Sequence, residues 1–264
     1  MDIDLGGRVA LVTGSTQGIG HAIATRLAQA GAAVVVNGRV GDRVGAAAAA
    51  VRDAVPDATV RGVVADLTDG EAVDDLLLEV PSVDILVNNL GIFGARPALE
   101  IDDAEWRRYF EVNVLAGVRL IRAYLPEMMR RGFGRVLSIS SDSSVVIPVE
   151  MVHHGVTKTA RLAVTRGFAK VAAGTGVTVN SVLAGPTHTG GVEEFVEQMV
   201  GADQPWEQAQ RTFMREHRPQ SLLQRLIEPV EIANMVAYLA SPLASATTGG
   251  AIRVDGGYVD AILP

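Results

Sequence analysis

The sequence predicts an α/β fold: a doubly wound, parallel, seven-stranded sheet with helices on both faces. Seven short apolar runs, rich in β-branched residues, alternate with helix-length segments along nearly the whole chain. These runs show little alternation of apolar and polar residues, which is typical of strands buried on both faces. Each run is followed by a segment long enough for the helical crossover that parallel strands need. In such a fold, ligands gather at the carboxyl ends of the strands.

The elements are expected in a regular order. Strands are predicted at 8–13, 32–38, 60–66, 84–89, 134–140, 176–182 and 250–257, and helices at 18–30, 41–54, 69–79, 103–131, 152–173 and 228–240. The alanine-rich run at 45–51 is interpreted as plain helix because alanine has the highest helix propensity. With 264 residues, 48% of them hydrophobic, one dinucleotide-binding domain spanning 1–264 is expected to bury a substantial core.

The segment 187–225 interrupts this alternation after the sixth strand. Its apolar residues follow helical spacing in two pieces, with Val192, Phe195, Val196 and Met199 in the first and Trp206 and Phe213 in the second. One interpretation is a helical pair that packs its own apolar stripe onto the domain. The other is a mobile helical lid over a substrate pocket, with Gly190 and Gly191 as hinge candidates. The two interpretations are compatible.

Composition narrows the possible functions. There is no cysteine, so disulfides, thiolate metal sites and a cysteine nucleophile are excluded, and no other residues have the spacing of a metal site. The formal charge is −7 with the charges interspersed, which argues against a nucleic-acid partner. The N-terminus opens acidic and shows neither a signal peptide nor a membrane span, so a cytoplasmic protein without a membrane partner is expected.

A glycine-rich turn follows the first strand directly. The stretch TGSTQGIG places Gly14, Gly18 and Gly20, with Ser15, Thr16 and Ile19 between them, where the first long helix begins. Backbone without Cβ atoms can approach a pyrophosphate there, and the helix start favours its charge. The spacing departs from G-x-G-x-x-G, so the turn alone is weak evidence. It is strengthened by NNLG at 88–91, which can bring Asn89 and Gly91 to the same crevice.

Several ordered motifs together give the chain a family resemblance. They are TGSTQGIG, NNLG, Asn113 in VNV, ISS at the end of the fifth strand, the lysine of HGVTK, AGPTHT after the sixth strand and RVDGG near the end. In these motifs the chain resembles the short-chain dehydrogenase/reductase family over nearly its whole length. The resemblance implies a Rossmann fold, a nicotinamide cofactor, hydride transfer between a carbonyl and an alcohol carbon, and usually a homotetramer. It also implies that Pro186, Thr187 and Thr189 lie over the nicotinamide amide and the pyrophosphate, whereas His188 is expected to be exposed.

The second predicted strand bears on the choice of cofactor. It ends VVVNGR, without the acid that an NAD-preferring relative would present to the ribose hydroxyls, and Arg39 could pair with a 2′-phosphate. NADP(H) is therefore expected over NAD(H), with a solvated arginine as the alternative. Asp66, followed by Leu67, fits the family position at the adenine edge, with an ordinary loop or helix-capping role as the competing interpretation.

The expected catalytic set is present with one change. In the family, a tyrosine precedes the lysine by four residues and a serine precedes that tyrosine by thirteen. Here Ser141 and Lys158 stand in register and Asn113 matches the relay asparagine, but the tyrosine position holds His154. Positions four apart share a helix face, so His154 and Lys158 can point to the same place while His153 is expected to face away. Asp142 and Ser143 are interpreted mainly as turn residues.

Three interpretations of His154 stay open. It can replace the tyrosine as proton donor, because imidazole exchanges protons near neutral pH. The pocket can instead serve non-redox chemistry such as epimerisation or dehydration, or catalysis can be lost and a dinucleotide-binding protein remain. The first is favoured because the other three residues and the glycine turn are intact. A small or medium carbonyl or alcohol is then the expected substrate, and a homo-oligomer the expected assembly.

Overall fold

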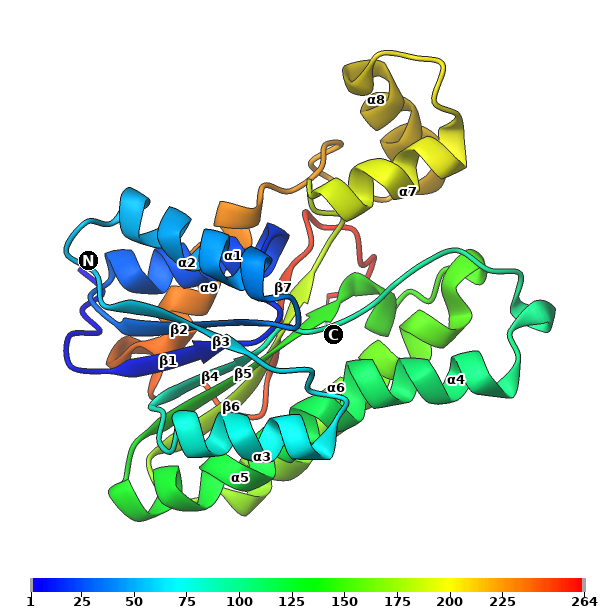
Figure 1. The fold of residues 1–264 in the computed structure, drawn as a ribbon. Helices are drawn as coiled ribbons and strands as arrows, with labels where there is room; N and C mark the ends of the chain where they lie inside the picture. The colour runs from blue at the N-terminus through cyan, green and yellow to red at the C-terminus, as the bar shows by residue number, and fades with distance from the viewer. Residues whose placement is uncertain (1, 263–264) are drawn as a thin grey trace.

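The computed structural model describes residues 2–262. In this part of the chain seven parallel strands form one sheet in the order β3-β2-β1-β4-β5-β6-β7, which confirms the predicted fold (Figure 1). The strands are β1 Val9–Val12, β2 Ala33–Gly38, β3 Val60–Val64, β4 Ile85–Asn88, β5 Gly134–Ser141, β6 Val177–Ala184 and β7 Ala251–Val254.

Helices cover both faces of the sheet. They are α1 Gly18–Gln29, α2 Gly41–Ala54, α3 Gly70–Glu79, α4 Asp103–Phe110, α5 Ala116–Arg131, α6 Val152–Val171, α7 Gly190–Val200, α8 Trp206–His217 and α9 Pro229–Ala240. Figure 1 shows α1, α2 and α9 on one face and α3, α5 and α6 on the other. Across the described residues, no helix combines the length and the apolar character needed to cross a bilayer.

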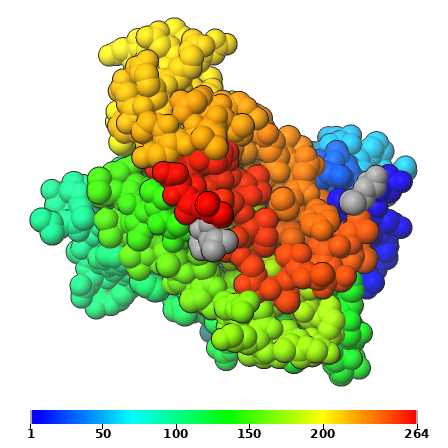
Figure 2. All heavy atoms as spheres, turned by 180° about the vertical axis from the view of Figure 1, so that it is seen from behind, coloured from blue at the N-terminus to red at the C-terminus, as the bar shows by residue number. Residues whose placement is uncertain are grey.

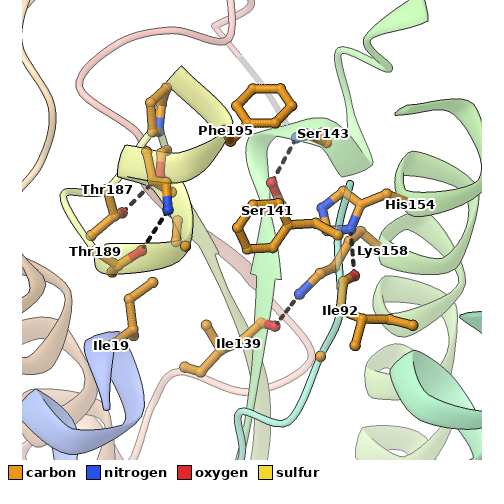
Figure 3. A pocket seen from close by; sticks show the side chains of 18 of the residues that line it. Ile19, Ile92, Ile139, Ser141, Ser143, His154, Lys158, Thr187, Thr189 and Phe195 are labelled. Carbon is orange, nitrogen blue, oxygen red and sulfur yellow. Dashed lines mark hydrogen bonds between the residues drawn. The ribbon is translucent and has the colours of Figure 1, made fainter. Parts of the chain in front are cut away.

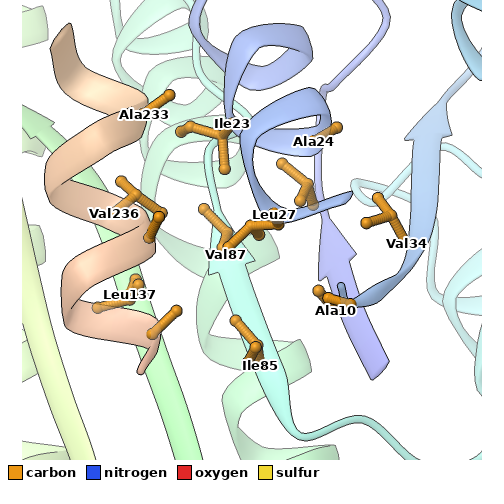
Figure 4. Packing of buried hydrophobic residues seen from close by; sticks show 14 of the residues in the cluster. Ala10, Ile23, Ala24, Leu27, Val34, Ile85, Val87, Leu137, Ala233 and Val236 are labelled. Carbon is orange, nitrogen blue, oxygen red and sulfur yellow. The ribbon is translucent and has the colours of Figure 1, made fainter. Parts of the chain in front are cut away.

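Each face of the sheet has its own hydrophobic core. On one side Ile23 and Leu27 from α1 and Val236 from α9 pack against strand residues such as Val87 (Figure 4). On the other side a second cluster joins α3 and α5 to the same strands. Full burial of one such side chain contributes about 1.5–3 kcal/mol. The strand ends that carry polar residues are therefore held in place by apolar packing on both faces.

The predicted helix at 103–131 is interrupted. The chain runs from α4 through a π-helical turn, Glu111–Leu115, into α5. Asn113 lies in this turn, and π-helical turns are frequent at functional sites. The apolar period that predicts helix does not distinguish a single wider turn, which is why the sequence misses it.

The segment 187–225 forms the predicted helical pair. In Figure 1 α7 and α8 stand at one end of the sheet, and Figure 2 shows the same pair projecting from the body of the molecule. Phe195 and Val196 of α7 pack against Phe213 of α8 in a third apolar cluster that also includes Met151. The packing interpretation of this segment is thus confirmed.

Candidate functional site

A cavity of about 350 Å³ lies at the carboxyl ends of β1, β4, β5 and β6, beside the first turn of α7 (Figure 3). Most of the residues that the sequence singles out line it: Gly14, Gly18, Ile19, Gly20, Asn89, Gly91, Ser141, His154, Lys158, Pro186, Thr187 and Thr189. The others, Ser15, Thr16, Arg39, Asp66, Leu67 and Asn113, lie outside this lining. The sheet therefore brings Ser141, His154 and Lys158 into one space with the three glycines of the turn.

The glycine turn is closely packed against the end of β4. Gly14 and Gly18 adopt positive φ values of 58° and 57°, which favour glycine. A Cβ at Gly20 would lie 2.6 Å from the carbonyl oxygen of Gly14, so no side chain fits there. The Asn89 amide donates to the carbonyls of Thr13 and Gly14, at 2.9 Å each. The turn is thus a bare-backbone cradle at a helix start, which suits a pyrophosphate.

Ser15 and Thr16 connect this cradle to the ends of β1 and β2. The buried Ser15 hydroxyl donates to the carbonyl of Val12 at 2.7 Å and accepts the backbone N–H of Asn37 at 3.0 Å. Thr16 packs over Gly38 at the end of β2, where a Cβ would come within 2.6 Å of its methyl group. Of the residues between the glycines, Gln17 and Ile19 line the cavity.

Arg39, Asp66 and Leu67 lie beyond the cavity, near the ends of β2 and β3. Arg39 is exposed, and within residues 2–262 no carboxylate forms a salt bridge with it. Asp66 accepts hydrogen bonds from the backbone and hydroxyl of Thr68, which lower its pKa together with the nearby Arg39 charge. The Leu67 side chain is buried in the core. Only its backbone can therefore face a ligand.

Asn113 fixes a backbone segment. Its side chain accepts the N–H of Ile92 at 2.8 Å and donates to the Ile92 carbonyl at 3.1 Å and to Thr157 at 3.0 Å. The same Ile92 carbonyl lies 3.0 Å from His154 Nδ1. Because a carbonyl only accepts, the Nδ1 atom of His154 carries the hydrogen, and in the neutral ring Nε2 is an acceptor. Asn113 thus sets the tautomer of His154 through one peptide group.

Burial and nearby positive charge favour the neutral form of the His154 ring. Burial, followed by the positive charge of Lys158, lowers its pKa from 6.5 to about 3. Burial is the larger of these two causes. At neutral pH only about one ring in 10⁴ would carry a second proton.

Lys158 lies on the same side of α6 as His154, as predicted. Its Nζ donates to the Ile139 carbonyl at 3.1 Å. Burial, and then the charge of Arg161, lowers its pKa well below the usual range. A Cβ at Gly91 would lie 3.4 Å from Nζ, so the Lys158 side chain lies next to Gly91 at the end of the NNLG segment.

Ser141 reaches the cavity from the end of β5 (Figure 3). Its hydroxyl donates to Asp142 Oδ1 at 2.8 Å and accepts the N–H of Ser143 at 3.1 Å. Ser143 N–H also donates to Asp142 Oδ1 at 2.6 Å. Asp142 and Ser143 do form the predicted turn, but they line the cavity as well.

His153 faces away from the cavity, as the helical spacing predicts. It is fully buried, and its ring centre lies 3.9 Å from that of Tyr109, between α4 and α6.

His188 is half-buried, whereas it is expected from the sequence to be exposed. Its Nε2 lies 2.7 Å from Glu193, and its ring stacks on Trp206.

Thr187 and Thr189 sit in the segment that leads to α7. The Thr187 hydroxyl donates to the Gly185 carbonyl at 2.8 Å, and Thr189 caps the start of α7. Pro186 lines the cavity beside them.

Several lining residues carry no signal in the sequence. Ile92 and Phe93 enter from the loop after β4, and Arg218 enters from the end of α8. Arg218 is buried and lies 3.3 Å from Glu150. A lone arginine after a helix has the same sequence pattern as any solvated residue, so only the fold shows that it lines the cavity.

Within residues 2–262, no three histidine or acidic side chains are grouped as metal ligands.

Comparison with known proteins decides the family. The model of the family described as enoyl-(acyl carrier protein) reductase matches residues 14–259. A 3-oxoacyl-[acyl-carrier-protein] reductase, FabG of Aquifex aeolicus (strain VF5), is 34% identical over 97% of this chain and 99% of its own. The chain belongs to the short-chain dehydrogenase/reductase family.

Other members of the short-chain dehydrogenase/reductase family match along their full length. An oxidoreductase of Bacillus subtilis (strain 168), YvaG, which is described as uncharacterized, is 45% identical over 99% of this chain and all of its own. The crystal structure of L-sorbose reductase from Gluconobacter frateurii, complexed with NADPH and L-sorbose, is 30% identical. It superposes with a TM-score of 0.92 over 99% of this chain and all of that one.

Proposed function

We propose that the chain is an NADP(H)-preferring oxidoreductase that interconverts a small or medium carbonyl compound and its secondary alcohol, with His154 exchanging the proton. The observation that carries this proposal is the convergence of Ser141, His154 and Lys158 on a cavity that continues into the glycine turn. The bare backbone of the turn fits a pyrophosphate, and bound NADP(H) would supply or accept a hydride.

The side chains divide the remaining work. Ser141 would hydrogen-bond the substrate oxygen, and Lys158 would hold the ribose next to the nicotinamide. Neutral His154 presents Nε2 as an acceptor, so it can take the proton of an alcohol directly. In carbonyl reduction it must first gain a second proton, which its low pKa makes rare. Asn113 keeps the ring in this orientation through the Ile92 carbonyl.

The test is turnover on a panel of carbonyls that includes L-sorbose and a 3-oxoacyl thioester, with NADPH oxidation as the readout. His154→Phe keeps an aromatic ring without a proton to exchange and should lower kcat by about 10²–10⁴ while NADPH binding stays. Turnover by His154→Phe at the parent rate would remove His154 from the mechanism.

A disabled, nucleotide-binding protein is the second candidate, and the low pKa of His154 favours it. Replacing His154 by Tyr restores the residue that the family has at this position. A parent that binds NADPH but is inert, together with an active His154→Tyr variant, would establish this second candidate and reject the first.

The cofactor preference rests on Arg39 and on the missing acid at the end of β2. NADPH should bind more tightly than NADH by about 1–3 kcal/mol if Arg39 holds the 2′-phosphate. Calorimetry of the parent and Arg39→Ala tests this. Equal affinities for the two cofactors, unchanged in the variant, would contradict it.

A homo-oligomer, in keeping with a family tetramer, is part of the proposal. Phe110 of α4, Leu115 of the π-helical turn and Val171 of α6 are 37%, 43% and 59% exposed. Light scattering should report a mass several times that of one chain, and a monomer at micromolar concentration would contradict it.

The α7–α8 pair would act as a lid, since Gly190, Gly191 and Phe195 line the cavity.

A further inference from the structure

The side chain beside Ser141 is a buried carboxyl group with uneven hydrogen bonding. Asp142 is 5% exposed. Its Oδ1 accepts from Ser143 N–H, from Ser141 O–H and, at 3.3 Å, from Ser143 O–H. Its Oδ2 is buried and has no hydrogen-bond partner among the described residues. An ionised carboxylate with one bare buried oxygen is costly, and a proton on that oxygen removes the charge and leaves a neutral hydroxyl, which costs less to bury than a carboxylate.

The charge on Asp142 decides what Ser141 offers to a substrate. Ser141 has one hydroxyl hydrogen, and its other contact, Ser143 N–H, is a donor. While Asp142 is ionised, a charge-assisted bond holds that hydrogen on Oδ1, and Ser141 presents only lone pairs to the cavity. With a proton on Oδ2, Oδ1 becomes a neutral and weaker acceptor, and the Ser141 hydrogen can turn to a carbonyl oxygen.

We propose that Asp142 is a positioning residue for the reaction, which must be a neutral carboxylic acid for Ser141 to donate its hydrogen bond to the substrate oxygen. This inference rests on the proposed oxidoreductase function. It adds no proton-transfer step, since His154 still exchanges the proton and Ser141 keeps its own.

The charged groups around Asp142 act in opposite directions. Burial is the largest influence and raises the pKa of Asp142. The Ser141 hydrogen bond, the charge of Arg218 after α8 and the Ser143 hydrogen bonds lower it. Lys158 on α6 and Tyr258 after β7 also interact electrostatically with Asp142, and Glu150 offsets Arg218. The site as a whole thus shifts Asp142 towards the neutral form.

Asp142→Asn mimics the protonated state, because its amide oxygen can replace Oδ1 and it cannot ionise. The experiment compares kcat/KM for carbonyl reduction in the parent and in Asp142→Asn from mildly acidic to alkaline pH. Any contribution of His154 cancels in the ratio of the two rates. The variant should match the parent at the acidic end and exceed it at the alkaline end, by about 10²-fold if Ser141 donation is then lost entirely. In a Ser141→Ala background the same substitution should leave the ratio constant.

A second readout does not depend on turnover. In protein labelled with ¹³C at the aspartate carboxyl groups, infrared spectra at neutral pH should contain a carboxylic acid C=O band that is absent from Asp142→Asn. The band can be sought in the parent even if the variant fails to fold. A parent without this band, or a constant rate ratio across pH with Ser141 intact, would overturn the inference. Absence of turnover from the parent and every variant would instead overturn the proposed function, and the spectrum would still decide the charge of Asp142.

Discussion

Acidification should destabilise this fold through His154. In the unfolded chain the pKa of this imidazole is near 6.5, whereas burial and Lys158 lower it to about 3 in the folded protein. Below the unfolded value the unfolded state binds a proton that the folded state does not bind. The stabilisation that comes from neutral His154 is therefore fully present above 6.5 and is lost as pH falls from 6.5 towards 3.

The size of the effect follows from the linkage relation. Each pH unit in which the unfolded state holds one extra proton costs about 1.4 kcal/mol. Between about pH 7 and pH 5 the unfolded imidazole becomes almost fully protonated, so the loss attributable to His154 is about 2 kcal/mol. His154→Phe retains a buried ring of similar shape and cannot titrate. It should therefore lose about 2 kcal/mol less than the parent over the same interval.

Urea unfolding followed by the fluorescence of Trp106 and Trp206 measures this difference. Comparing slopes with pH, rather than absolute stabilities, removes the packing cost of the substitution. His154→Tyr is a second variant that stays neutral over the interval, and it should flatten the dependence to the same extent. If the parent and both variants lose equal stability on acidification, His154 is not held neutral by its surroundings.

The other predictions concern the cradle and the peptide that orients the ring. Gly20→Ala should lower the free energy of unfolding by about 2–4 kcal/mol and weaken nucleotide binding, because its Cβ would meet the Gly14 carbonyl and displace the Asn89 amide. Gly167→Ala is the matched control: its Cβ meets nothing within 4 Å on α6, so it should stabilise by about 0.5–1 kcal/mol and leave binding unchanged. Asn113→Ala should cost about 2–4 kcal/mol through three lost hydrogen bonds and should lower kcat with little change in nucleotide affinity. Denaturant unfolding and calorimetry check the stabilities and affinities of all three variants, and the rate of NADPH oxidation checks kcat. An Asn113→Ala protein as stable as the parent would contradict the role given to its hydrogen bonds.

The sequence predicts the parts of this structure that repeat or that need a particular residue type. Alternation of buried strands with helices predicts seven parallel strands, because burial on both faces leaves a simple apolar pattern. Helical spacing predicts that His154 and Lys158 share a side of α6 and that His153 does not. Glycines at a strand-to-helix turn predict the cradle, since a close backbone approach excludes every other residue.

What the sequence does not predict depends on backbone groups and on long-range folding. The Ile92 carbonyl that sets the tautomer of His154 has no sequence signature, because every residue carries one. The π-helical turn at Asn113 has the same apolar pattern as ordinary helix. Arg218 reaches the cavity from a segment 60 residues after Lys158, and the capture of the Ser141 hydrogen by Asp142 depends on one rotamer.

The framework of the site does not depend on the residue at position 154. The buried Arg161 donates to the carbonyls of Asn113 in the π-helical turn, Ile139 in β5 and Leu90 just after β4, so a cation supplies these backbone groups with a hydrogen-bond partner. Lys158 donates to the Ile139 carbonyl as well. None of these bonds involves His154, whose side chain forms one hydrogen bond among the described residues, to the Ile92 carbonyl that Asn113 already holds. We therefore expect His154→Tyr to change the side chain that is available for proton exchange while the hydrogen bonds of Arg161 and Lys158 stay in place, and we expect the variant to fold as the parent does.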